Sequence, residues 1–354
     1  MNGGFMEILV PSLLRIKPNA LYKIGKYLRL CGYREVAVVY GEGVKEMLYK
    51  TLEISFISSE IKIVHEDTSK TNDLDDAFSS AKQIPSRAKA LVAIGGGKTI
   101  DYCKYIALIN KLPLISVPTI VSNDGFCSPL SSMLVNGARK TVKTKIPDGV
   151  IVDTQILLNA PEMFLYSGMG DLFCKITAIF DWKLAYKKAG EEVNDFAAVV
   201  SRNAVETFLQ YRDKSFSNTE FLSIIVSSLL MSGIAMEIAQ SSRPASGSEH
   251  LISHAYDKFA KKPSIHGLQT GVASYPMSYL QGEETFATVK QAILESGFAD
   301  FMEKNPLDKP DFIKAVQHAS EIKENYYTVL SEKNSIEKTI DFIETDELMR
   351  RMVR

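Results

Sequence analysis

The sequence predicts two domains: an α/β domain with a parallel sheet over residues 1–161, followed by an all-helical domain over 162–354. Two observations carry this prediction. In the first part, short apolar runs rich in β-branched residues alternate with helix-length amphipathic segments, as expected for parallel strands covered by helices on both faces. In the second part, apolar residues recur at helical spacing. A chain of 354 residues also exceeds what one hydrophobic core usually supports.

Five strands of the predicted sheet follow from short runs rich in β-branched residues, at 36–40, 61–64, 91–94, 114–117 and 150–152. Amphipathic segments at 20–31 and 74–84 predict two of the helices that cover it. Asn136-Gly137 stands between two strand-like runs and predicts an antiparallel hairpin with a type I′ turn. In such a sheet, we expect the ligand crevice beyond the carboxyl ends of the strands.

In the second domain, apolar spacing predicts one helix from Asp171 onward and another over 222–239. Gly168 and Gly170 directly precede the first of these helices. We interpret them as a flexible link and place Asp171 at the helix start, where an aspartate commonly serves as a cap.

Composition favours a small-molecule partner. The formal net charge is -1, with 23% charged and 45% hydrophobic residues, so no basic excess is present to bind nucleic acid or an anionic membrane surface. Residues 1–10 lack the features of a signal peptide, and no apolar run approaches the roughly 20 residues that span a bilayer. The four cysteines are far apart, which suits reduced thiols. We expect a cytoplasmic protein without membrane insertion.

Three consecutive glycines follow the predicted strand 91–94 and open a helical segment. A P-loop would need glycine at Val92, and a standard dinucleotide fingerprint would need glycine at Ile100. Both motifs are therefore excluded. Glycines at such a junction allow backbone N–H groups to approach a phosphate, so a variant pyrophosphate-binding turn is favoured over a simple tight turn.

Histidines form the second candidate site. Three of the five in the chain, His250, His254 and His266, fall within 17 residues. His250 and His254 are four apart and would share one face of a helix, while Leu251 stands where a zinc protease needs glutamate. His266, in a predicted loop, and Asp171 are further candidate ligands for a metal. Spacing alone leaves open which neighbouring histidine joins His250.

Four motifs together resemble one family. They are Gly95-Gly-Gly-Lys-Thr-Ile-Asp101, Val117-Pro-Thr-Ile-Val-Ser-Asn-Asp-Gly125, Gly170-Asp-Leu-Phe-Cys-Lys-Ile-Thr-Ala178 and Ser242-Arg-Pro-Ala-Ser-Gly-Ser-Glu-His250. Over about 90–275 the chain resembles the glycerol-1-phosphate dehydrogenases, within the broader group of glycerol dehydrogenases, iron-containing alcohol dehydrogenases and dehydroquinate synthases. The resemblance implies a Rossmann-like domain, a helical domain, and NAD(P)- and metal-dependent interconversion of dihydroxyacetone phosphate and sn-glycerol 1-phosphate.

The resemblance also assigns roles to individual residues. It implies metal ligation by Asp171, His250 and His266, with Asp171 therefore next to the substrate. His254 and Asp124 fall where the family contacts substrate; we assign the proton transfer to His254 and orientation of a terminal hydroxyl to Asp124. The implied dinucleotide contacts are Gly97, Lys98, Thr99, Ile100, Asp101, Thr119, Ile120, Val121, Ser122 and Ser128.

Three departures from the family pattern stand out. Lys175 replaces the fourth, histidine ligand of iron-dependent relatives, which implies three protein ligands and an open coordination position. Gly41-Glu42 displaces the acidic residue expected near the adenosine ribose, so the choice between NAD and NADP stays open. Asn123 stands where many relatives carry histidine, a change without an explanation in the sequence.

The sequence gives less direct evidence on the identity of the metal, the oligomeric state and the residues that bind the substrate phosphate. Ligand type favours zinc, then nickel, which bacterial members of the family use, then iron. The family implies a homodimer or larger oligomer. Candidate phosphate ligands are Arg243, in the most specific motif, and three hairpin lysines, Lys140, Lys143 and Lys145, although basic hairpin edges are usually only solvated.

Three other functions compete with this one. A dehydrogenase of unphosphorylated glycerol would use the same site without a phosphate pocket. A lyase resembling dehydroquinate synthase would use NAD transiently, with no net NADH change. A binding protein that kept only the fold would need neither metal nor dinucleotide.

Overall fold

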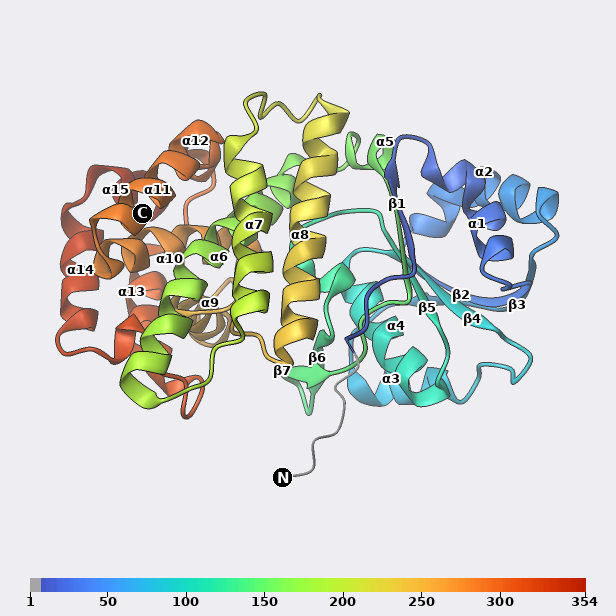
Figure 1. Ribbon diagram of the computed structural model, residues 1–354, viewed down its shortest axis with the longest axis horizontal. Helices are drawn as coiled ribbons and strands as arrows, with labels where there is room; N and C mark the ends of the chain where they lie inside the picture. Colours follow the sequence, from blue (N-terminus) through green and yellow to red (C-terminus); the bar gives the residue numbers. More distant parts are fainter. Residues whose placement is uncertain (1–7) are drawn as a thin grey trace. The chain divides into compact units, whose positions relative to one another are not determined.

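The computed structural model describes residues 8–354. The chain forms two compact units, which divide between Ala160 and Pro161 (Figure 1). The first is built on a parallel sheet, and the part from Pro161 onward, all of it described, consists of helices and loops. The predicted fold class is therefore confirmed.

The sheet of the α/β unit has six parallel strands in the order β1-β8-β5-β4-β2-β3. Their bounds are β1 Leu13–Lys17, β2 Glu35–Gly41, β3 Lys62–Ser69, β4 Ala90–Gly95, β5 Leu114–Pro118 and β8 Gly149–Asp153. The five predicted strands are all present. Strand β1, at the sheet edge beside β8, was missed because it carries Arg15 and Lys17 and has only one β-branched residue, Ile16.

Helices cover both faces of this sheet. The α/β unit contains η1 Ala20–Lys23, α1 Ile24–Leu30, α2 Val44–Ser58, α3 Leu74–Ala81, α4 Gly97–Asn110, η2 Asp124–Cys127 and α5 Thr154–Leu157. Helices α1 and α2 lie on one face and α3 and α4 on the other (Figure 1). On the first face, Leu28, Leu52 and Phe56 pack in one core cluster with Val38 and Val92 of the strands.

The predicted hairpin is confirmed as a separate two-stranded sheet. Strands β6 Leu130–Val135 and β7 Ala138–Lys143 pair antiparallel, with Val135 opposite Ala138. The connecting residues Asn136 and Gly137 both have positive φ, 53° and 75°, as a type I′ turn requires.

The helical unit contains α6 Glu162–Ala189, α7 Asp195–Gln210, α8 Thr219–Ala239, α9 Ser248–Phe259, α10 His266–Gln281, α11 Glu283–Glu295, α12 Phe298–Lys304, α13 Lys309–His318, η3 Ala319–Glu321, η4 Val329–Ser331, α14 Ser335–Thr345 and α15 Glu347–Met352. Two expectations were wrong. Helix α6 begins at Glu162, so Gly168 and Gly170 lie inside it and Asp171 is not a cap. Likewise, His266 opens helix α10 instead of lying in a loop.

Length and composition alone would allow two helices, α6 and α8, to cross a membrane. This corrects the expectation that no segment is long and apolar enough. In each helix 72% of the most apolar window is buried inside the protein. Such burial is that of a core helix, so these segments are weak evidence for membrane insertion.

Candidate metal centre and coenzyme loop

Asp171, His250 and His266 come together in the helical unit from three different helices, α6, α9 and α10. Each offers a potential ligand atom, and these atoms all lie within 4.8 Å of one another. His250 Nε2 is 3.9 Å from Asp171 Oδ1, and the ring centroids of His250 and His266 are 4.9 Å apart. One carboxylate and two imidazoles are a donor set that suits a divalent cation. The residues present therefore fit such an ion.

Glycines bring two of these side chains together. A Cβ atom on Gly170 would lie 2.0 Å from the carbonyl oxygen of Gly267, and one on Gly267 would lie 2.0 Å from that of Ser167. Because no other residue fits such a contact, helices α6 and α10 pack backbone against backbone at this point. Asp171 directly follows Gly170, and His266 directly precedes Gly267. Gly170, interpreted from the sequence as part of a flexible link, thus serves close packing beside the metal candidates.

His254 borders this cluster without joining its donor group. It lies one turn after His250 on α9. Its ring centroid is 6.2 Å from that of His250 and 5.8 Å from that of His266. The side chain is half-buried. The structure thus separates the two histidines that spacing left as alternatives: His266 belongs to the donor group, and His254 lies beside it.

Glu249 is a buried neighbour of the cluster that the sequence did not single out. Its Oε1 is 2.9 Å from His250 Nδ1, and its carboxylate also accepts from the Gly247 N–H and the Thr177 hydroxyl. Burial raises the pKa of Glu249 to about 7, against the lowering effect of the Gly247 and Thr177 hydrogen bonds. Its position directly before His250 in the most specific motif was the available signal.

A second possible donor group consists of Cys174, Glu249 and His250, whose ligand atoms also lie within 4.8 Å of one another. Its members are otherwise engaged: Glu249 accepts the bonds described above, and Cys174 Sγ is 2.8 Å from the carbonyl oxygen of Asp171. We therefore take the group with Asp171 as the metal candidate.

Lys175 lies next to the carboxylate of this group. Its Nζ is 3.1 Å from Asp171 Oδ2, and its side chain is fully buried. The position that holds a fourth ligand in iron-dependent relatives thus holds a cation here. An ammonium group cannot bind a metal while protonated.

Asp181 fixes the start of helix α9, which carries His250. This fully buried carboxylate accepts from the N–H and hydroxyl of Ser248 and from the Val329 N–H. Burial, together with the charge of Glu249, raises the pKa of Asp181 to about 7. The helix that bears His250 and His254 therefore begins at a buried polar anchor.

Arg243 has no geometry for a substrate phosphate, contrary to its status as a candidate. The side chain is 1% exposed. Its guanidinium forms a two-point pair with Glu191, with one bond of 2.7 Å, donates to the Tyr327 carbonyl and lies 3.5 Å from the Tyr326 ring centroid. These contacts assign it a structural role within the helical unit.

The three candidate lysines lie on strand β7 and just after it. Lys140 and Lys143 are exposed on β7, as expected for a solvated hairpin edge. Lys145 pairs with Asp148 at 2.8 Å.

The glycine turn lies at the point between β2 and β4 where the strand order reverses: β3 is added on one side of β2, and β4, β5 and β8 follow on the other side. A Cβ atom on Gly95 would approach the backbone nitrogen of Gly41 to 3.1 Å, so the carboxyl ends of these strands are close together. A Cβ atom on Gly97 would meet nothing within 4 Å. Loop 119–122 lies alongside, because the Thr119 N–H donates to the Gly95 carbonyl at 3.0 Å. Such switch points are the usual ligand crevices of α/β sheets.

Several implied coenzyme residues have side chains with internal partners. Lys98 donates to the Lys70 carbonyl at 3.1 Å, and the Thr99 hydroxyl lies 2.8 Å from that of Ser69. Ile100 and Val121 are buried, whereas Ile120 lies against Gly96. Ser122 is half-buried on the same loop. Any coenzyme contact at Ile100 and Val121 would therefore be through the backbone.

Lys104, which the sequence did not single out, organises the loop that bears Asp124 and Ser128. Its buried Nζ lies 2.9 Å from Asp101 Oδ1 and 2.8 Å from the Gly125 carbonyl, and it also contacts the Leu130 carbonyl. Burial raises the pKa of Asp101, while Lys104 opposes that shift. The Ser128 hydroxyl donates to Leu130 at 2.9 Å. The observed roles of Asp101 and Ser128 are structural.

Asn123, the unexplained departure, caps the turn that contains Asp124. Its Oδ1 accepts from the Gly125 N–H at 2.9 Å, at the start of η2. Asparagine is among the preferred residues for this task, so the substitution has a local structural reason.

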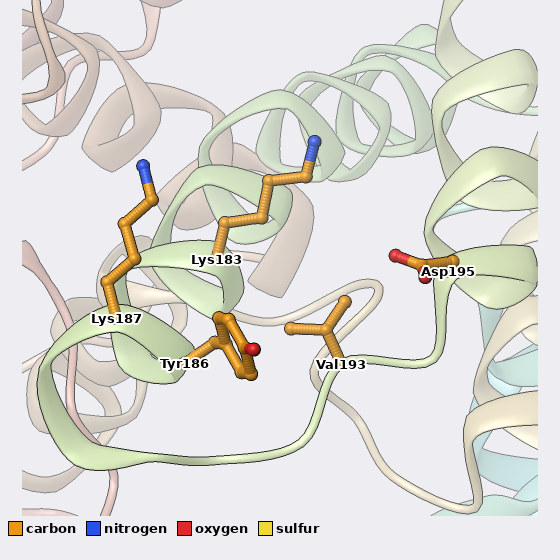
Figure 2. Close-up of a pocket in the computed structure, with 5 residues that line it drawn as sticks. All are labelled: Lys183, Tyr186, Lys187, Val193 and Asp195. Atoms are coloured by element: carbon orange, nitrogen blue, oxygen red, sulfur yellow. The ribbon is translucent and has the colours of Figure 1, made fainter.

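A surface hollow elsewhere in the helical unit contains none of the predicted site residues. It is lined by Lys183, Tyr186, Lys187, Val193 and Asp195, at the end of α6 and the start of α7 (Figure 2). Lys183, Lys187 and Asp195 put charges of both signs around it.

Comparison with known proteins agrees with this arrangement. Residues 15–161 match a family model described as iron-containing alcohol dehydrogenase. The fold is similar to that of glycerol dehydrogenase from Schizosaccharomyces pombe, with a TM-score of 0.75 and 18% identity, covering 98% of this chain and 91% of the other. A probable glycerol dehydrogenase from Sinorhizobium meliloti gives a TM-score of 0.73 at 17% identity, covering 97% of each chain. The fold is thus that of the iron-containing alcohol and glycerol dehydrogenases.

Sequence relatives narrow the class. The chain is 32% identical over 347 residues to the glycerol-1-phosphate dehydrogenase of Staphylothermus marinus, covering 96% of each protein. It is 33% identical over 318 residues to that of Methanosarcina acetivorans, covering 90% of this chain and 85% of the relative. The chain belongs to the glycerol-1-phosphate dehydrogenase family.

Proposed function

We propose that the protein is an NAD(P)-dependent and metal-dependent dehydrogenase that interconverts dihydroxyacetone phosphate and sn-glycerol 1-phosphate. The observation that carries the proposal is the grouping of Asp171, His250 and His266 within 4.8 Å, in a chain whose relatives are named glycerol-1-phosphate dehydrogenase, NAD(P)+. A fold retained only for binding would not need this donor set.

The two units divide the work. Residues 1–161 bind the coenzyme at the glycine turn and at loop 119–122 and supply Asp124, and residues 162–354 hold the metal and supply the other substrate contacts. When bound, a divalent cation supplies a Lewis acid that polarises a carbonyl group, and a nicotinamide supplies hydride. Zinc is the first choice for the metal, nickel the second and iron the third, because Lys175 replaces the fourth ligand of iron-dependent relatives.

Proton transfer falls to His254. It lies beside the donor group, and a neutral or protonated imidazole can exchange a proton with a substrate oxygen near neutral pH. Asp124 is assigned to the terminal hydroxyl of the substrate on family resemblance. Arg243 is removed from the phosphate candidates because its donors are used within the fold.

We also infer a cytoplasmic location and a homodimer or larger assembly. The four cysteines are free thiols, three of them buried, which suits a reducing compartment. The small-molecule substrate and the near-neutral net charge of -1 agree with a metabolic enzyme without a nucleic acid partner.

The test is a comparison of initial rates with dihydroxyacetone phosphate and with dihydroxyacetone, at fixed NADH or NADPH. Two charge-assisted hydrogen bonds to a phosphate contribute about 3 kcal/mol or more, so kcat/KM should be at least about 100-fold higher for the phosphorylated ketone. Equal values would favour a glycerol dehydrogenase. Absence of net NADH oxidation with either ketone would instead favour a lyase.

A further inference from the structure

Helices α9 and α10 share a chain of hydrogen bonds that ends on His266. The Ser253 hydroxyl is 3.0 Å from His266 Nδ1 and 2.6 Å from Gln269 Oε1. Gln269 Nε2 in turn lies 2.9 Å from Asp257 Oδ1 and 2.8 Å from the Ser264 carbonyl. Ser253 is fully buried and Gln269 is 1% exposed, so the central bond of the chain, between these two side chains, is shielded from bulk water, whereas Asp257, Ser264 and His266 at its ends are half-buried.

The direction of each hydrogen bond follows from the far end of the chain. The Asp257 carboxylate and the Ser264 carbonyl only accept, so the amide nitrogen of Gln269 must face both of them. Gln269 Oε1 then faces Ser253 and can only accept. The Ser253 hydroxyl therefore donates its single proton to Gln269, and its oxygen must accept from His266.

We propose that Asp257, Gln269 and Ser253 fix His266 as the tautomer protonated on Nδ1, which leaves the Nε2 lone pair to bind the metal. This inference deepens the proposed function and rests on it for the metal. Ser253 and Gln269 are positioning residues, because they act through His266. The Nδ1 proton cannot shift to Nε2 unless the serine hydroxyl reverses, and the orientation of Gln269 opposes that reversal.

The other histidine ligand is held differently. His250 Nδ1 lies 2.9 Å from the Glu249 carboxyl group, so a single direct neighbour can select the same tautomer. For His266 the charge is two residues away, beyond Ser253 and Gln269. Indirect neighbours of this kind typically change metal affinity 10–100-fold.

The direct test is the tautomer of His266 in the metal-free protein. Nitrogen-15 labelling of the five histidines, with His266→Gln for assignment, reports which ring nitrogen carries the proton. The measurement is made near pH 8. We expect Nδ1–H in the natural protein. A predominant Nε2–H form would overturn the proposal without any reference to activity.

Variants extend the test. Gln269→Met frees the serine hydroxyl to donate to His266, so the tautomer should shift toward Nε2–H. Ser253→Ala should weaken Zn²⁺ binding about 10–100-fold in a chelator competition titration. The matched control is Ser274→Ala on the same helix as His266, because Ser274 is equally buried and its hydroxyl donates only to the Thr270 carbonyl at 2.8 Å. The control should change the Zn²⁺ affinity less than about threefold.

The outcomes separate the two proposals. Equal loss of Zn²⁺ affinity in Ser253→Ala and Ser274→Ala would reduce Ser253 to a packing role and overturn the proposal that it fixes the tautomer of His266. If His266→Ala bound Zn²⁺ as tightly as the natural protein, the metal site in the proposed function would be wrong. The tautomer measurement would still show whether Ser253 and Gln269 orient His266. If Ser253→Ala does not fold, the tautomers of the natural protein and of Gln269→Met give the decision.

Discussion

Each unit of the molecule buries a lysine beside an aspartate one helical turn away, but the two pairs have different surroundings. In the α/β unit, Lys104 Nζ lies 2.9 Å from Asp101, and in the helical unit Lys175 Nζ lies 3.1 Å from Asp171. Both lysine side chains are fully buried. Burial of a charge is costly unless it is paired and hydrogen-bonded, so both pairs need a reason to exist.

The other contacts of each pair explain why the lysine is buried. Lys104 also contacts main-chain carbonyls at Gly125, Ser128 and Leu130, so its charge holds a loop in place. Lys175 pairs with a carboxylate that belongs to the metal donor group. The same two residue types at nearly the same spacing therefore build a loop anchor in one unit and a neighbour of the metal candidates in the other.

The largest effect is expected for Lys104→Met. The variant leaves the Asp101 carboxylate buried without its cation and three carbonyl groups without their donor, which should cost about 3–5 kcal/mol of stability. Thermal unfolding should show the loss equally with and without added Zn²⁺, and hydrogen exchange should increase over residues 124–132. Lys89→Met, at an exposed lysine of the same unit, is the control. An unchanged unfolding temperature for Lys104→Met would refute the anchor.

A smaller and metal-dependent effect is expected for Lys175→Met. Without metal, the variant should be destabilised because the Asp171 charge loses its partner; Zn²⁺ should restore most of the stability, since a cation again neutralises that charge. Removal of the competing ammonium group should also tighten Zn²⁺ binding about 10-fold, or about 1.4 kcal/mol. Calorimetric titration and thermal unfolding measure both effects. Weaker Zn²⁺ binding by the variant would show that Lys175 supports the site instead of competing with the ion.

Sequence reasoning succeeded where the signal was local. The strands of the α/β unit follow from short runs rich in β-branched residues, and the hairpin from Asn136-Gly137, because turn type depends on adjacent residues. Strand β1 was missed because it has two charged residues and only one β-branched residue, Ile16. Local patterns thus identified strands rich in β-branched residues, including the edge strand β3, and missed the edge strand β1.

Local sequence patterns did not predict the contacts that shape the metal site, because those contacts join residues distant in the sequence. Gly168 and Gly170 were interpreted as a flexible link, since glycine is unfavourable inside a helix, but both lie within α6, where Gly170 allows close contact with the backbone of Gly267. That contact joins residues nearly 100 positions apart, so no local pattern reveals it. Ser253 and Gln269 escaped notice for the same reason, because their partners lie on a different helix.

The central claim is that Asp171, His250 and His266 hold one divalent cation that the dehydrogenase reaction requires. The most direct measurement is NADH oxidation with dihydroxyacetone phosphate by protein stripped with a chelator, before and after Zn²⁺, Ni²⁺ or Fe²⁺ is restored. We expect stripping to abolish the rate, one ion per chain to restore it, and His250→Ala to show neither bound metal nor turnover. Full activity of the stripped protein, or of His250→Ala without metal, would contradict the account.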